Sequence, residues 1–184
     1  LVKIVRNKNL SENIIIVDGL PGCGKSMLSS IISSFDRVEL LSYSFEIEFM
    51  CRLHHLKKIS EDASIAMINN LVDYKLYNSM MGRDVNFRYS DLSSVFSYPK
   101  PIEYFKRIFQ EGDLTVPKKI FNSKPILNLT THDLLGMSKP IFKALKTRLT
   151  FVEVVRHPLF MLIQQFFNFE RLLFNTRDIQ IHFE

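Results

Sequence analysis

The sequence lacks several features that mark familiar classes of protein. It has no Trp and only two cysteines, Cys23 and Cys51, which excludes a disulfide framework and favours a reducing compartment. No apolar stretch approaches the roughly 20 residues that cross a bilayer. No run of Lys and Arg forms a basic arm, and the dispersed net charge of +5 is too small to indicate nucleic-acid binding. We therefore expect a cytoplasmic protein with no membrane span and no nucleic-acid partner.

The bulk composition is that of a globular protein. Hydrophobic residues make up 46% of the chain and charged residues 23%, and 184 residues suit one domain, 1–184, with a substantial core. The chain begins at Leu1, with neither an initiator Met nor a signal peptide. Because residues 178–184 have the pattern of a strand that is just beginning, we expect a piece of a longer chain, incomplete at its C-terminal end. No pattern predicts an oligomeric state.

The rest of the chain is organised around residues 13–32, NIIIVDGLPGCGKSMLSSII. The β-branched run at 14–17 predicts a strand buried on both faces of a parallel sheet. Apolar residues then recur at helical spacing over 27–32. Between the predicted strand and helix lies GLPGCGKS, which has the spacing G-x-x-x-x-G-K-[ST]. Strand, glycine-rich turn and helix are the context in which this motif binds phosphate.

The chemistry of this turn follows from its residue types. Glycines adopt positive φ and let backbone N–H groups close around an anion, and the start of a helix adds its dipole. Lys25 adds a mobile charge, and Ser26 offers a hydroxyl to a phosphate oxygen or a metal. We predict that the turn binds a phosphate group of a nucleotide; the alternative is a turn that only caps a helix. The candidate binding residues are Gly19, Pro21, Gly22, Cys23, Gly24, Lys25 and Ser26.

Strands and helices are predicted to alternate along the rest of the chain. Further strands are expected at residues 38–41, 126–129 and 151–155, and helices at 45–59, 61–81, 102–110, 139–145 and 159–174. This alternation predicts an α/β fold, a three-layer sandwich with a central, mostly parallel sheet and helices on both faces. Residues 45–112 form a helical insert, which either shapes the pocket of a second substrate or only packs against the sheet.

Polar side chains follow two of the predicted strands. Thr131 and His132 come after the strand at 126–129, and Arg156 comes after the strand at 151–155. Because ligands bind beyond the carboxyl ends of parallel strands, we expect these side chains to lie near the phosphate-binding loop.

Other polar residues on the predicted 45–59 helix point less clearly to a site. Glu46 and Glu48 are expected on a solvated face; the alternative is that one of them faces the loop as a base or substrate ligand. Adjacent His54 and His55 point in different directions, so no metal site is predicted there. Cys23 is interpreted as a small residue that fits the loop rather than as a redox sensor.

Three stretches resemble the sulfotransferases that use 3′-phosphoadenosine 5′-phosphosulfate (PAPS). GLPGCGKSMLSSII is similar to that family's 5′-phosphosulfate loop, and LTTHDLL at 129–135 resembles the segment with the catalytic histidine. FVEVVRHPLFMLIQQF at 151–166 resembles the strand, Arg-x-Pro turn and helix that bind the donor's 3′-phosphate. The resemblance implies a P-loop fold of the nucleoside triphosphate hydrolase type.

The resemblance also implies roles for individual residues. Arg156 and Gln164 would bind the 3′-phosphate, His132 would take a proton from the acceptor, and Lys25 would act on the donor. The pattern departs from the family where Gly22 replaces a basic residue and Lys25 a threonine or serine. Thr130 likewise stands where a lysine is usual, and Gln164 where a serine is usual.

Two enzymatic functions and one binding function are consistent with these residues. The first is sulfuryl transfer from PAPS to a hydroxyl or amine of a small-molecule or glycan acceptor, which needs no metal. The alternative is a P-loop kinase or nucleoside triphosphatase that uses ATP or GTP with Mg²⁺ held by Ser26. Against it, no second predicted strand ends in a metal-binding Asp. A third interpretation is a nucleotide-binding module without catalysis.

Overall fold

Apolar residues form the centre of the fold. The computed structural model describes residues 2–112 and 114–173, with the last four of these described as backbone alone. In strand β1 (Asn13–Asp18), the side chains of Ile14, Ile16 and Val17 are at most 1% exposed. Because neighbouring side chains of a strand point to opposite faces, this burial requires cover on both faces of the sheet.

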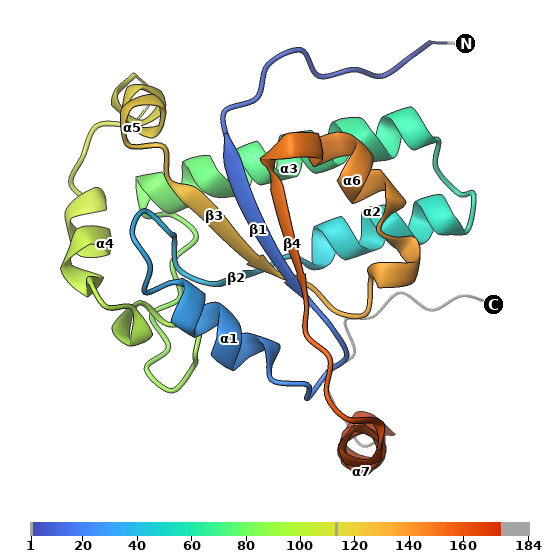
Figure 1. Ribbon diagram of the computed structural model, residues 1–184. Coiled ribbons are helices and arrows are strands. Elements are labelled where there is room, and N and C mark those ends of the chain that lie inside the picture. Colours follow the sequence, from blue (N-terminus) through green and yellow to red (C-terminus); the bar gives the residue numbers. More distant parts are fainter. Residues whose placement is uncertain (1, 113, 174–184) are drawn as a thin grey trace.

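Four strands form the sheet in the described part of the chain. β1 lies between β3 (Ile126–Thr130) and β4 (Leu149–Glu153), and β2 (Ser42–Tyr43) lies beyond β3, in the order β2-β3-β1-β4. All pairs are parallel, so the carboxyl ends of the strands meet at one edge (Figure 1). The predicted α/β class with a parallel central sheet is confirmed.

Seven α-helices in the described residues surround this sheet. They are α1 (Lys25–Ile32), α2 (Phe45–His55), α3 (Glu61–Met81), α4 (Pro101–Arg107), α5 (Thr115–Ser123), α6 (Lys139–Leu145) and α7 (Pro158–Leu173), with 3₁₀ turns η1 (Val95–Ser97), η2 (Leu135–Met137) and η3 (Lys146–Arg148). The connection after β1 runs one way across the sheet, and those after β2 and β3 run the other way. Right-handed crossovers therefore put α1 on one face and α2, α3 and α6 on the other, consistent with three layers (Figure 1).

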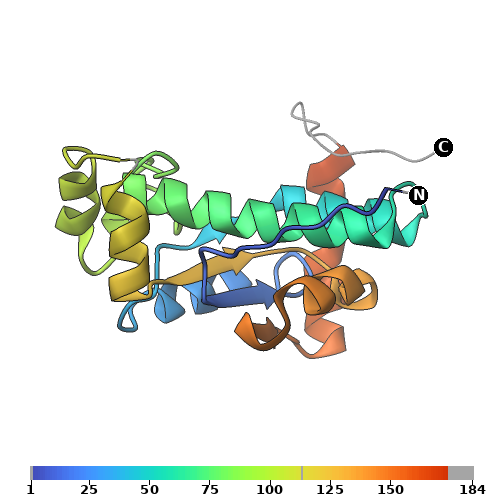
Figure 2. The same ribbon diagram turned by 90° about the horizontal axis from the view of Figure 1, so that it is seen from above.

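The longest helix, α3, supplies much of the core. Its side chains Ile68, Val72, Leu76 and Met80 are at most 2% exposed and belong to the same cluster as the apolar residues of β1 and β3. The segment before β1 runs along this helix (Figure 2), where Arg6 Nη2 lies 2.5 Å from Asp73 Oδ2. The core is therefore built mainly between the sheet and α3.

The predicted helical insert is longer than expected. It continues past the turn at Gly112 because α5, which the sequence did not predict, follows that turn. Pro117 lies in the first turn of α5. Backbone N–H groups in the first turn have no partner within the helix, so the missing N–H of a proline costs no hydrogen bond there. Val116 and Ile120 anchor α5 in the core.

Two predicted strands differ from the observed ones. β2 begins at Ser42 instead of residue 38: Val38 forms only an isolated bridge to Ile126, and the Leu40 N–H donates to the hydroxyl of Tyr104 at 2.7 Å. β4 spans 149–153 instead of 151–155, and it is half-buried because it borders β1 alone in the described sheet. The expected strand at 178–184 lies outside the described residues.

No helix in the described residues is long and apolar enough to cross a membrane. This agrees with the absence of such a stretch from the sequence, where no apolar run reaches the roughly 20 residues required. α7 is the most apolar of the helices, and it has 16 residues.

Candidate functional site

The glycine-rich turn joins β1 to α1 at the carboxyl edge of the sheet. Gly22 and Gly24 have φ of 86° and 106°, values that residues with a side chain rarely adopt. Gly24 is the N-cap of α1, so Lys25 and Ser26 open the helix with backbone N–H groups that have no partner within it. The turn therefore has the backbone geometry that the sequence predicted for an anion site.

Buried polar contacts fix α1 against β3. The hydroxyls of Ser29 and Thr130 lie 2.8 Å apart, and Asn128 Nδ2 donates to Ser29 O and Ser33 Oγ, each at 2.9 Å. All four side chains are buried, at most 3% exposed. Directional bonds of this kind fix the position of α1, and with it the position of the loop.

Lys25 is buried beneath the loop, with 4% of its surface exposed. Its Nζ lies 3.4 Å from the carbonyl oxygen of Leu20. Burial lowers the pKa of Lys25, while nearby Cys23, Asp18 and further acidic groups act in the opposite direction. A desolvated ammonium group close to the helix start is suited to bind an anion.

Asp18, at the end of β1, holds the turn that carries His132. It is fully buried, and its carboxylate accepts hydrogen bonds from Thr131 Oγ1 at 2.8 Å and from Leu134 N at 2.7 Å. These bonds fold the segment after β3 back over the end of β1. The sequence predicted the strand end but gave no role to Asp18.

His132 lies beside a carboxylate that the sequence analysis had placed on a solvated face. Its Nδ1 is 2.9 Å from Oε1 of Glu48, which is 2% exposed. The expectation for Glu48 was therefore wrong: α2 turns Ile47, Glu48 and Cys51 inward. Glu46 is about half exposed, as expected, and pairs with Lys75 at 3.3 Å.

Arg156 and Gln164 both lie next to the loop. The Arg156 side chain is exposed, and its Nη1 lies 3.4 Å from the carbonyl oxygen of Gly22. A Cβ atom at Gly22 would be 2.3 Å from Cγ of Gln164, so a larger residue at position 22 would require the Gln164 side chain to move. Both predicted 3′-phosphate ligands are thus close to the predicted phosphate loop.

Two further amides of α7, which the sequence analysis did not single out, bind the loop directly. Gln165 Nε2 and Asn168 Nδ2 donate to the carbonyl oxygen of Pro21 at 2.7 and 3.1 Å. Three amide side chains at i, i+1 and i+4 in a mostly apolar helix were the available signal, because this spacing places them on one helix face.

Glu153, at the end of β4, lies opposite Asp18 in the strand register. Burial, and then the charge of Asp18, raise the pKa of Glu153. Its Oε2 is buried and has no hydrogen-bond partner among the described residues. No group of three or more His, Cys, Asp or Glu side chains that could hold a metal occurs within residues 2–112 and 114–173.

A cavity of about 220 Å³ opens beside β2. Its lining combines Tyr43 with Lys75, Asp84 and Asn86 of the insert. The hydroxyl of Tyr43 is 3.0 Å from Ser26 Oγ, so this side chain joins the wall of the cavity to the loop.

No protein-family model matches this chain, and no curated protein or solved structure in the comparisons matches it either. The site is therefore interpreted from its own geometry.

Proposed function

We propose that the protein is a PAPS-dependent sulfotransferase with a P-loop fold. One observation carries the proposal: the three stretches that resemble this family meet at one edge of the sheet. The Asp133 N–H donates to the Gly19 carbonyl at 3.2 Å, Arg156 reaches the Gly22 carbonyl, and Gln164 packs on Gly22. Segments that are distant in the sequence and share a family's order are thereby neighbours in space.

The loop supports binding of the donor's 5′-phosphosulfate. Its three positive-φ glycines and the start of α1 direct N–H groups outward, and Lys25 adds a positive charge. Arg156, exposed at the rim, can leave Gly22 to form a bidentate contact with the 3′-phosphate, and Gln164 adds an amide donor. These residues match the charge and hydrogen-bonding needs of the two ends of PAPS.

In the proposed reaction, an acceptor hydroxyl or amine attacks the sulfur of the donor. The bond between sulfur and the bridging phosphate oxygen breaks, a new bond from sulfur to the acceptor forms, and adenosine 3′,5′-bisphosphate leaves. His132 takes the proton of the acceptor, and Lys25 stabilises the negative charge that grows on the leaving phosphate oxygen.

The cavity beside β2 is the proposed acceptor site. Its walls carry hydroxyl, amide and charged groups from the insert, which suit a small polar acceptor or a glycan unit.

A P-loop kinase or nucleoside triphosphatase is the second candidate function. Two observations favour it: the loop contains the full triphosphate motif with Ser26, and Glu153 has a buried, unpartnered oxygen beside Asp18. In P-loop nucleoside triphosphatases, Mg²⁺ is held by the P-loop Ser or Thr together with an acidic residue elsewhere in the site. A nucleotide-binding module without catalysis is the third.

Titration calorimetry with adenosine 3′,5′-bisphosphate, ATP and GTP, each with and without Mg²⁺, separates these functions. We expect the bisphosphate to bind without metal, and Arg156→Ala to weaken it by about 1.5–3 kcal/mol, the value of a charged hydrogen bond. Arg88→Ala, which removes an exposed arginine of the insert, is the matched control and should leave affinity unchanged. Mg²⁺-dependent ATP binding with no preference for a 3′-phosphate would overturn the proposal.

The role of His132 needs a separate measurement. His132→Ala should lower the rate of sulfuryl transfer by about 10²–10⁴-fold, the contribution of a general base. The affinity for the donor should stay at the wild-type value. Unchanged turnover would remove His132 from the reaction. Bisphosphate binding with no transfer to any tested acceptor would support the binding module instead.

A further inference from the structure

We infer that Glu48 is the positioning residue for His132: it fixes the proton on Nδ1 and leaves Nε2 free to accept a proton. The inference deepens the proposed function and rests on it for the catalytic use of His132. Glu48 is on α2 and His132 follows β3, 84 positions apart in the sequence, yet Nδ1 and Oε1 are 2.9 Å apart.

The tautomer follows from the chemistry of the two groups. A carboxylate offers lone pairs and no proton, so the hydrogen bond requires Nδ1 to be the donor. In a neutral imidazole the other nitrogen, Nε2, then carries the lone pair. Histidines that accept protons in enzymes are commonly held in this way, with one nitrogen bonded to an acceptor and the other facing the reaction.

The burial of Glu48 argues against an incidental contact. A carboxylate that is 2% exposed has lost its water and needs partners for both oxygens. Oε1 faces His132, and Oε2 is 3.5 Å from Nη2 of Arg52, one turn further along α2. The carboxylate is therefore held between an imidazole on one side and a guanidinium on the other.

Two aromatic rings restrain the plane of the imidazole. The rings of Phe45 and His132 have centroids 5.6 Å apart and planes 7° apart, and those of Tyr43 and His132 are 6.1 Å and 13° apart. Rotation of the imidazole about the Cβ–Cγ bond would break the hydrogen bond to Glu48, and tilting of the ring plane would disturb this stacking. The carboxylate selects the nitrogen, and the aromatic rings limit the orientation of the ring.

The test is the nitrogen-15 spectrum of the imidazoles at mildly alkaline pH, with His132 identified by its loss in His132→Ala. We expect His132 in the wild-type protein to be protonated on Nδ1. In Glu48→Gln, which keeps the shape but lets an amide donate to the ring, the Nδ1–H population should fall. The exposed His55 is the internal control and should not change.

Kinetics distinguish a positioning role from a structural one. Glu48→Gln should lower kcat for sulfuryl transfer by about 10- to 100-fold, with the acceptor KM and the affinity for adenosine 3′,5′-bisphosphate unchanged. Glu48→Asp, which keeps the carboxylate, should recover part of the loss.

The outcomes separate this inference from the proposed function. A wild-type His132 protonated on Nε2, or a tautomer that Glu48→Gln leaves unchanged, overturns the inference whether or not transfer is observed. If Glu48→Gln does not fold, the wild-type spectrum alone still decides. A tautomer that depends on Glu48, in a protein that transfers no sulfuryl group, supports the positioning and refutes the sulfotransferase proposal.

Discussion

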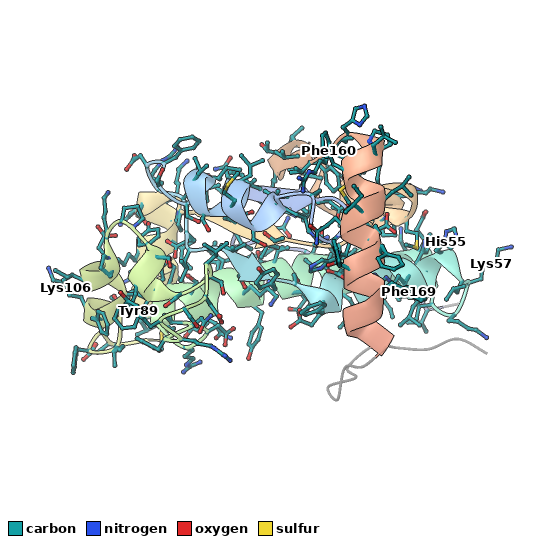
Figure 3. The ribbon with its side chains drawn as sticks, turned by 90° about the horizontal axis from the view of Figure 1, so that it is seen from below. His55, Lys57, Tyr89, Lys106, Phe160 and Phe169 are labelled. Carbon is teal, nitrogen blue, oxygen red and sulfur yellow. The ribbon has the colours of Figure 1, made fainter. Side chains whose placement is uncertain are left out.

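The two longest helices in the described residues, α3 and α7, differ in the burial of their apolar residues, which are mostly buried in α3 and mostly exposed in α7. α3 has 21 residues and buries Leu76 completely, together with most of its apolar stripe. α7 has 16 residues, yet Leu162, Phe166 and Phe169 are 65–71% exposed. Figure 3 shows α7 as an element separate from the sheet, with Phe160 near the start of the helix and Phe169 further along it.

The difference lies in what holds each helix. α3 packs on the sheet and on α6, α2 and α5, whereas α7 is held by amides that donate to the loop and by Met161, which is 7% exposed. An apolar sequence therefore predicts that a helix forms, but it does not predict which surface covers its apolar face. The polar side of α7 contacts the loop, where Gln165 and Asn168 donate to the Pro21 carbonyl.

The largest effect that this comparison predicts is on stability. Leu76→Ala in α3 should lower the free energy of unfolding by about 2–5 kcal/mol, because it leaves a cavity in the core. Phe166→Ala in α7 removes a larger side chain but should change it by only about 0.5 kcal/mol, since that ring is already exposed. Urea unfolding of both variants measures the difference; equal losses would show that α7 is packed like α3.

A smaller effect is expected where α7 meets the loop. Gly22→Ala places a Cβ against Gln164 at φ of 86°, and the left-handed backbone alone costs about 1–2 kcal/mol. Gly136→Ala is the control, since a Cβ there meets nothing within 4 Å. Adding Gln164→Ala should recover the steric part of the loss and not the backbone part. Equal stability of the Gly22 and Gly136 variants would contradict the contact.

The smallest effect is the acid sensitivity of the buried ion pair between Glu39 and Arg107, which contacts Ser79 near the end of α3. Burial works to raise the pKa of Glu39, but the hydrogen bond and charge of Arg107, with Ser79 and Tyr104, outweigh it and lower the pKa. A carboxyl with a lowered folded pKa stabilises the protein above its unfolded pKa, and this stabilisation is lost as pH falls through the folded one. Stability should therefore decline more steeply with acid in the wild type than in Glu39→Gln. Parallel pH curves would contradict this.

Local signals explain what the sequence could predict. Ser60 caps α3, with its hydroxyl accepting from Ala63 N, and Gly82 ends the helix with φ of 72°, as both residue types indicate. The glycine-rich turn was predictable for the same reason, because its spacing is a property of a few adjacent residues.

What could not be predicted depends on contacts between distant segments. α2 has apolar residues on more than one side, and two that recur at helical spacing, Phe45 and Leu56, are 41% and 40% exposed. The fold instead turns Glu48 inward, where Arg52 and His132 meet its charge. From its charge alone, a glutamate is predicted to be exposed to solvent. Only partners from distant segments, here His132 together with Arg52, make its burial favourable.

The hydroxyl and amide bonds between α1 and β3 have a consequence for ligand exchange. A helix held by apolar contacts alone can rotate slightly about its long axis, which would move the backbone N–H groups at its N-terminus away from a bound anion. The bonds from Ser29 and Ser33 to Thr130 and Asn128 oppose that rotation, because hydrogen bonds weaken as their donor and acceptor move out of line. We therefore expect structural change on ligand binding or release to occur at α7 rather than at α1, because α7 contacts the turn through the exposed amides of Gln165 and Asn168.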